Sequence, residues 1–224
     1  GCTALKSIGS LHNLETIGQG AFSGCSALEH VDDLYSLTRL EYDVFSHCVS
    51  LISVDCSDKL TAIGSSAFFG CKALVSIGDL SNVTSIESSV FRGCIALKSI
   101  GNMPKLESIG MQCFMGCTAL ETVGDLSSLK EIPSETFDGC TSLVSIGDLS
   151  NVTIIGSYGF NQCKKLTSIP NLGSLERVDQ FAFSGCESLA LLGNLRKLTS
   201  FGNSPFVNSP FHNCPNPVSY THLR

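Results

Sequence analysis

Apolar residues recur at every third position along most of the chain, and the whole pattern repeats after 23 residues. Counting from a repeated Cys as position 1, Leu, Ile or Val holds most of positions 4, 7, 10, 13 and 16, as at Leu97, Ile100 and Ile109. A step of three fits neither the 3.6-residue period of an α-helix nor the two-residue alternation of a strand. The pattern predicts short strands separated by corners, in a chain that winds around a common core.

Two further residue types mark each unit. Cys recurs every 23 residues without an insertion, and from the second unit on a Phe stands three residues before it. Gly commonly occupies position 23, directly before the Cys. Such a fixed period identifies a repeat array. The two columns consist of Cys2, Cys25, Cys48, Cys71, Cys94, Cys117, Cys140, Cys163 and Cys186, and of Phe22, Phe45, Phe68, Phe91, Phe114, Phe137, Phe160 and Phe183.

Each unit is expected to supply two short strands and one helical turn. The strands are predicted near positions 4–7 and 13–16, represented by 97–100 and 106–109, and the helical turn over positions 18–23, where it would hold the Phe. Seven inward side chains at about 1.5–3 kcal/mol each cannot offset the ordering of one coil at about 1–2 kcal/mol per residue. Coils must therefore stack through parallel strand ladders. We expect a β-rich solenoid of about nine 23-residue coils.

The residues around the Phe and Cys columns resemble the BspA-type leucine-rich repeats, whose units carry an A-F-x-x-C-x-x-L-x-x-I core. The stretches 21–28 and 182–189 match this core closely. The resemblance covers residues 1–202 and implies a right-handed leucine-rich-repeat solenoid. It also implies a non-catalytic, secreted or cell-surface protein of a bacterium or protist that adheres to host matrix proteins or to other cells.

The end of the chain departs from the repeat. Residues 203–216 contain the echo Ser204–Asn208 and Ser209–Asn213, which predicts an irregular terminal repeat or the remnant of a cap. Residues 217–224, with the sequence PVSYTHLR, are unlike anything before them and are interpreted as an adapter-like, non-native tail. The repeat array is accordingly expected to end at residue 202.

Composition narrows the choice of partner. The chain has 224 residues, of which 43% are hydrophobic and 15% charged, and its net charge is −6. Lys and Arg are scattered singly, which argues against nucleic-acid binding. No stretch approaches 18 consecutive apolar residues, so direct membrane insertion is not expected. The expected partner is a protein, and no cofactor is expected.

Four sets of reactive side chains are candidate sites. The Cys column predicts buried free thiols rather than disulfides, and the absence of C-x-x-C pairs argues against a metal. Position 9 carries Asp33, Asp79, Asp125 and Asp148, which suit either a Ca²⁺ ladder or simple turn formation. His30 lies near Asp32, yet no activated Ser or Cys nucleophile is identifiable beside them, so no enzyme is predicted. The sequons at Asn82 and Asn151 reflect glycosylation or a duplicated three-coil block.

Positions 5 and 6 vary freely between fixed neighbours and are expected to face outward. They predict a broad, mildly acidic surface that contacts a macromolecular partner. Exposed apolar residues within it would suit a protein partner, although position 5 could also simply prefer strand-forming residues. A structural spacer or stalk and an intracellular interaction scaffold are the alternative functions. The predicted contact residues are Lys6, Glu29, His30, Ile52, Val75, Lys98, Glu121, Thr122 and Val144.

Overall fold

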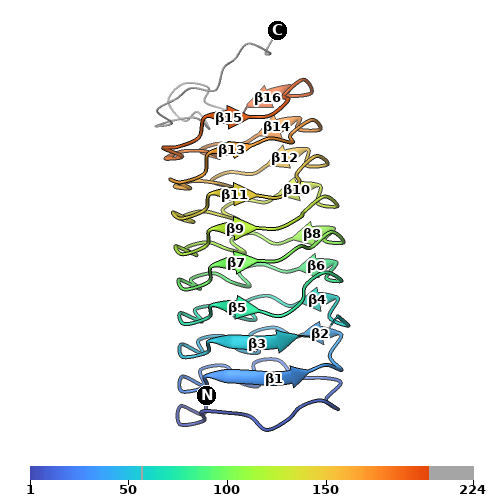
Figure 1. Cartoon of the computed structure of the whole chain (residues 1–224), viewed down its shortest axis with the longest axis vertical. Helices are drawn as coiled ribbons and strands as arrows, with labels where there is room; N and C mark the ends of the chain where they lie inside the picture. Colours follow the sequence, from blue (N-terminus) through green and yellow to red (C-terminus); the bar gives the residue numbers. More distant parts are fainter. Residues whose placement is uncertain (57, 202–224) are drawn as a thin grey trace.

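Each coil of the chain lies directly on the one before it, as a computed structural model shows for residues 1–56 and 58–201 (Figure 1). The described residues form sixteen short strands, two in each of eight successive coils, and all strand pairs are parallel. The predicted β-rich repeat solenoid is confirmed. The expectations for residues 203–216 and 217–224 lie outside the described residues.

The first strand of each coil belongs to one stack, here called the first strand stack. Its strands hydrogen-bond in the orders β1-β3-β5, β7-β9-β11 and β13-β15, with pairs such as Ser53 and Ser76 one repeat apart. The bounds are β1 (His30–Leu34), β3 (Ser53–Cys56), β5 (Ser76–Ile77), β7 (Ser99–Ile100), β9 (Thr122–Val123), β11 (Ser145–Ile146), β13 (Ser168–Ile169) and β15 (Leu191–Leu192).

The second strand of each coil forms the second strand stack on another side of the solenoid. Its strands hydrogen-bond in the orders β2-β4-β6-β8 and β10-β12-β14-β16, again with partners one repeat apart. The bounds are β2 (Arg39–Leu40), β4 (Ala62–Ile63), β6 (Ser85–Ile86), β8 (Ser108–Ile109), β10 (Glu131–Ile132), β12 (Ile154–Ile155), β14 (Arg177–Val178) and β16 (Ser200–Phe201).

The expected number of nine coils is slightly wrong. Residues 1–24 make only an isolated bridge, between Ser7 and His30, rather than a strand pair of their own. Eight coils therefore carry both strands in the described part of the chain.

The predicted helical turn over positions 18–23 is also wrong, because no helix occurs among the described residues. Position 19 has a φ of 56° to 60° in every coil from Asp43 to Phe181, and position 23 is left-handed as well, mostly as Gly. Right-handed helices need φ near −63°, so two left-handed residues four apart prevent one. The segment is a succession of tight turns instead.

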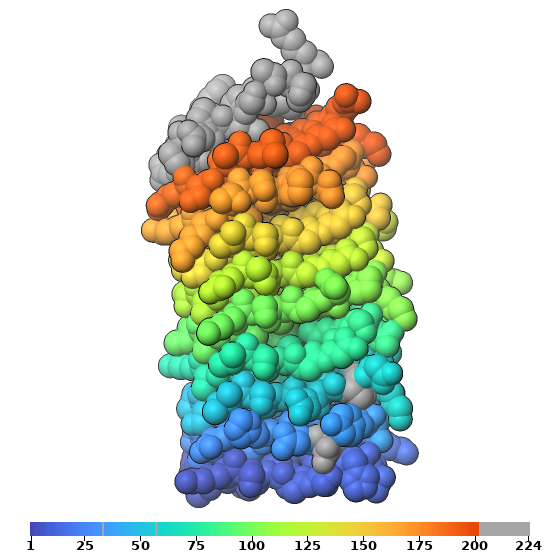
Figure 2. Space-filling model, viewed as in Figure 1, coloured from blue at the N-terminus to red at the C-terminus, as the bar shows by residue number. Residues whose placement is uncertain are grey.

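These turns form a third hydrogen-bonded side. The N–H groups at positions 19, 21 and 23 donate to carbonyls of the next coil, as from Phe45 to Ala67 at 2.8 Å and from His47 to Phe69 at 2.7 Å. On the strand sides the direction is reversed, since the later coil donates to the earlier one, as from Ile52 to Glu29. Every coil is thus tied to its neighbour on three sides, and Figure 2 shows the coils as closely packed layers.

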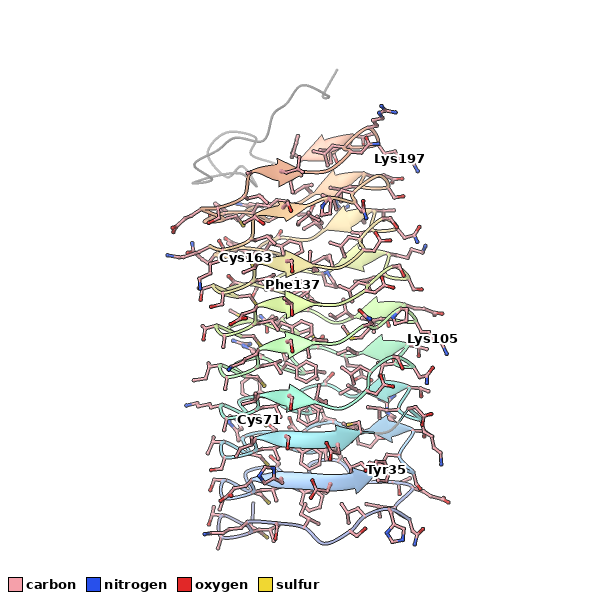
Figure 3. All side chains as sticks on the ribbon, viewed as in Figure 1. Tyr35, Cys71, Lys105, Phe137, Cys163 and Lys197 are labelled. Carbon is pink, nitrogen blue, oxygen red and sulfur yellow. The ribbon has the colours of Figure 1, made fainter. Side chains whose placement is uncertain are left out.

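The core consists of parallel columns that run the length of the solenoid. Eight Phe rings, from Phe22 to Phe183, stack with centroids 5.1–5.6 Å apart and nearly parallel planes. The Cys column lies beside them. From Cys48 to Cys186 each thiol donates to the carbonyl of a Phe in the preceding coil, at 3.0–3.2 Å. Figure 3 shows Cys71, Phe137 and Cys163 inside the coils, with Lys105 and Lys197 pointing outward. One ring and one thiol per coil explain the strict period.

Local order breaks where the repeat pattern breaks. The register of β1 and β3 shifts between Val31 and Leu34, and Leu34 then lies opposite the buried Cys56. Cys56 stands at position 9, where other coils carry a polar turn residue.

The structure of the described residues includes no helix that is long and apolar enough to cross a membrane.

Candidate functional site

The predicted contact residues at position 5 form one continuous row along the first strand stack. Each backbone N–H donates to the carbonyl of the row member one coil earlier, from Glu29 to Lys6 through Ile52, Val75 and Lys98 onward, at 2.8–3.5 Å. The side chains of Lys6, Glu29, Ile52, Val75, Lys98, Glu121 and Val144 are all exposed, as are those of His30 and Thr122 at position 6. The structure therefore brings all nine predicted residues together on one surface, while their role in binding stays a prediction.

Three successive coils carry a compact group of exposed apolar and cationic residues, here called the apolar–lysine patch. Position 5 contributes Ile52, Val75 and Lys98, and position 2, in the turn that leads into the row, contributes Val49, Lys72 and Ile95. The four apolar side chains are 37–48% exposed. No ion pair of Lys72 or Lys98 occurs among the described residues.

The charge of this surface differs from the expectation of a mildly acidic face. Positions 2, 3, 5 and 6 carry five Lys against three Glu, whereas positions 14, 15 and 17, along the second strand stack, carry seven carboxylates against three cations. The sequence prediction used the net charge of the whole chain, which the second strand stack dominates. The first set is Lys6, Lys72, Lys98, Lys164, Lys165, Glu29, Glu121 and Glu187, and the second is Glu15, Glu41, Glu87, Glu107, Glu131, Glu176, Asp179, Arg39, Lys130 and Arg177.

Position 6 forms a row of hydroxyl side chains beside the contact row. The strand pairing places Ser53 next to His30, and the His30 Nδ1 atom lies 3.1 Å from the Ser53 Oγ atom. Ser53, which the sequence did not point to, therefore lies beside His30. The pair lies on the outward side of the first strand stack, where His30 is exposed and Ser53 is half-buried. Nucleophilic catalysis also needs N–H donors for the developing oxyanion, and strand N–H groups here, such as that of Ile52, already serve the ladder.

The second strand stack uses its outward polar groups within the molecule. Thr61 and Thr84 donate their hydroxyls to carbonyls of the preceding coil at 3.0 and 3.2 Å. The Arg39 Nη2 atom donates to Glu87 Oε1 at 2.6 Å across two coils, and the Ser65 hydroxyl donates to Glu87 Oε2 at 2.9 Å. The hydrogen bonds from Arg39 and then Ser65 lower the pKa of Glu87. These hydrogen bonds and ion pairs link neighbouring coils to one another.

The Asp column at position 9 serves turn formation. Asp79 accepts the Ser81 N–H at 2.8 Å and the Ser81 hydroxyl at 2.9 Å, and Asp125 makes the same two contacts with Ser127. Asp148 repeats them with the Ser two residues on. The carboxylate oxygens thus bind their own turns. Of the alternatives considered for this column, the geometry supports turn formation, and the described residues contain no group of three metal-ligating side chains.

The thiols of the Cys column from the second unit on lie inside the coils. All the column thiols from Cys25 to Cys186 are buried and free, whereas Cys2 is exposed. Burial raises the pKa of Cys48 to about 12 and the pKa of Cys94 and Cys140 well above the ordinary thiol value. A reactive cysteine needs a lowered pKa and access to solvent, and these groups have neither.

Two surfaces were missed by reasoning from the sequence. Val49 and Ile95 at position 2 were overlooked because that position lies in a turn, where a three-residue period does not set the direction of a side chain. Position 19 carries left-handed residues other than Gly in seven consecutive coils, including Gln112, Tyr158 and Phe181. These residue types give no sign of the left-handed conformation, so no signal in the sequence points to this second variable edge.

Comparison with known proteins agrees with the repeat architecture. Residues 1–121 and 107–224 match the family described as BspA type Leucine rich repeat region, in six copies. A leucine-rich repeat protein from T. pallidum is 27% identical, with 67% of this chain and 70% of that chain covered and a TM-score of 0.62. One from Eubacterium ventriosum is 19% identical, with 98% and 73% covered and a TM-score of 0.67. A leucine rich cell surface protein from Faecalibacterium prausnitzii is 24% identical, with 91% and 74% covered and a TM-score of 0.50. The sequence matches no curated protein.

Proposed function

The chain belongs to the BspA-type leucine-rich repeat family, and we propose that it is a non-catalytic module that binds another protein through the outward side of the first strand stack. The single observation that carries this proposal is the distribution of exposed apolar side chains. Six of the ten exposed large hydrophobic residues in the described part of the chain lie on this side, at position 2, 5 or 6. Contiguous exposed apolar surface is typical of sites of protein interaction.

The proposed contact residues are those of the row and its neighbours. Rigid strands hold them at one spacing, so a partner would meet a preorganised surface and little side-chain ordering would be lost on binding. The row consists of Lys6, Glu29, His30, Ile52, Val75, Lys98, Glu121, Thr122 and Val144. We add Val49, Lys72 and Ile95, because they extend the same surface.

The module is proposed to act at a cell surface or outside the cell, as part of an adhesin-like protein. This placement comes from the family resemblance, and the neighbour from Faecalibacterium prausnitzii is itself described as a cell surface protein. Host matrix proteins and other cell-surface proteins are the partner classes that the resemblance implies. A structural spacer is the second candidate, favoured by the regular stacking of coils over the described length (Figure 1).

Binding of purified extracellular-matrix proteins to the immobilised chain, measured by surface plasmon resonance, tests the proposal. A variant with Ile52→Ser and Val75→Ser should lose at least about tenfold in affinity, since it removes two apolar contacts of more than 1 kcal/mol each. The matched control carries Thr61→Ser and Thr84→Ser on the second strand stack and should bind like the unchanged chain. Saturable binding that both variants retain would refute the proposed face, and absence of any binding by the folded chain would favour the spacer.

A further inference from the structure

We infer that the apolar–lysine patch receives a segment of protein that combines apolar side chains with carboxylates. This inference rests on the proposed function and names the chemistry of the partner for the same surface. It depends on three features of the patch: the apolar side chains adjoin one another, the two Lys lie among them, and the opposite charge is missing from the patch itself.

The apolar part of the patch is continuous across neighbouring coils. The Val75 N–H donates to the Ile52 carbonyl at 2.9 Å, so these two exposed side chains stand one strand spacing apart on the same side. The Ala73 N–H donates to the Val49 carbonyl at 3.2 Å, which fixes the turn of one coil on that of the next. Ile95 follows in the third coil and is 48% exposed. A partner would gain by covering these side chains together.

The two Lys occupy different outward positions in neighbouring coils: Lys72 stands at position 2 and Lys98 at position 5. In the coil of Ile52 both outward positions are apolar, in the next coil Lys72 precedes Val75, and in the third Ile95 precedes Lys98. Both Lys therefore have exposed apolar residues as neighbours at the same outward positions of adjoining coils. A partner that covers the apolar side chains would partly desolvate these ammonium groups and must supply acceptors for them.

The contrast with other cations of this chain shows what is missing. On the same side, Lys164 pairs with Glu187 at 3.1 Å, and on the second strand stack Arg39 pairs with Glu41 and Glu87. Among the described residues Lys72 and Lys98 have no such ion pair. Carboxylates from a partner would supply it, and buried charge pairs give an interface its specificity. The apolar content of the patch and its two Lys disfavour a nucleic acid, which needs a run of phosphate contacts.

Selection from a library of random twelve-residue peptides displayed on phage tests the inference. The unchanged chain is the target, and peptides that also bind an Ile52→Ser, Val75→Ser variant are removed, which leaves those that depend on the patch. We expect Asp and Glu to be enriched at least about twofold over the starting library, together with apolar residues. Affinity of the enriched peptides should fall with added salt.

Charge reversal supplies the decisive comparison. A variant with Lys72→Glu and Lys98→Glu should bind the acidic peptides at least about tenfold more weakly and should instead select peptides rich in Lys and Arg. Lys130→Glu on the second strand stack is the matched control and should leave selection unchanged. Patch-dependent peptides without an excess of acidic residues would overturn the inference and leave the proposed function standing. Failure to recover any patch-dependent peptide from the folded chain would overturn both.

Discussion

The outward sides of the two strand stacks are built on the same core and serve different ends. Along the second strand stack, hydroxyls such as those of Thr61 and Thr84 bind carbonyls of the preceding coil, and Arg39 is paired with carboxylates. Along the first, Ile52 and Val75 expose apolar surface that nothing in the described structure covers. Polar groups that are hydrogen-bonded within the molecule stabilise the fold. Exposed apolar side chains contribute favourable free energy only when a partner covers them. This difference is the reason for proposing the first side, rather than the second, as the one available for recognition.

The first prediction concerns the buried thiols of the core on which both strand stacks are built. Burial raises the pKa of eight described thiols above the ordinary value of 9.0, namely Cys48, Cys56, Cys71, Cys94, Cys113, Cys117, Cys140 and Cys163. Above pH 9 the unfolded chain releases these protons and the folded chain keeps them. Their contribution to stability is therefore complete below the unfolded pKa and declines as the pH rises toward the raised folded values.

Between pH 8 and pH 10 we expect the free energy of unfolding to fall by about 1 kcal/mol for each fully buried thiol, or on the order of 5–8 kcal/mol in all. Urea titrations at the two pH values measure this loss by circular dichroism. Cys94→Ala serves as the control, because it should release one proton fewer on unfolding and so flatten the pH dependence by one thiol. Equal stability at both pH values would contradict the buried-thiol column.

The second prediction removes one ring from the Phe stack. Phe114 is fully buried between Phe91 and Phe137, with centroids 5.2 and 5.3 Å away. Phe114→Ala should reduce the free energy of unfolding by about 3–5 kcal/mol, because it creates a cavity and interrupts the stack. Chemical denaturation measures the change, and Met111→Ala, at a side chain that is 55% exposed, should cost less than about 0.5 kcal/mol. Similar losses for the two variants would show that the rings are not the common support of both sides.

The parts of this structure that the sequence could predict are those where every coil repeats the same physical demand. Leu, Ile, Phe and Cys recur because each must fill the same core slot, so the solenoid and the exposed row at position 5 follow from spacing. The helical turn could not be excluded in this way. Only Gly at position 23 signals a left-handed residue, while Asp43, Gln112 or Tyr158 at position 19 carries no such mark. Their conformation is imposed by hydrogen bonds to the next coil.

The charge of the two sides shows a second limit of prediction. Net charge is a sum over the chain, and it suggested an acidic contact surface. The carboxylates prove to be concentrated along the second strand stack, and the first carries the excess of Lys. Charge could have been assigned to sides only after each coil position had been placed, because positions 5 and 14 are both mostly exposed and belong to different strand stacks.

The third prediction removes the Glu87 carboxylate, which joins neighbouring coils on the outward side of the second strand stack. Glu87 accepts hydrogen bonds from Arg39 and Ser65, which lower its pKa from the ordinary value of 4.5. A lowered folded pKa stabilises the fold above the unfolded value, and this contribution is lost as the pH falls through the folded value. The side chains of Arg39 and Glu87 are both substantially exposed. We therefore expect Glu87→Gln to lower the free energy of unfolding by less than about 1 kcal/mol at pH 7. Thermal unfolding at pH 7 and pH 3 checks it, since the difference between the variant and the unchanged chain should become smaller at the lower pH.

The smallest effect compares one hydroxyl on each side. Thr84 donates its hydroxyl to the Thr61 carbonyl, whereas Thr122, in β9 of the first strand stack, has an exposed side chain. Thr→Val keeps the branched shape and removes only the hydroxyl, so both substitutions retain strand preference. Thr84→Val should lower the free energy of unfolding by about 0.5 kcal/mol through the lost hydrogen bond, and Thr122→Val should leave it unchanged or raise it slightly. Replicate urea titrations resolve such a difference. Equal losses for the two variants would mean that the hydroxyls of the second side add no stability of their own, and the distinction between a self-satisfied side and an available side would then rest on apolar exposure and charge alone.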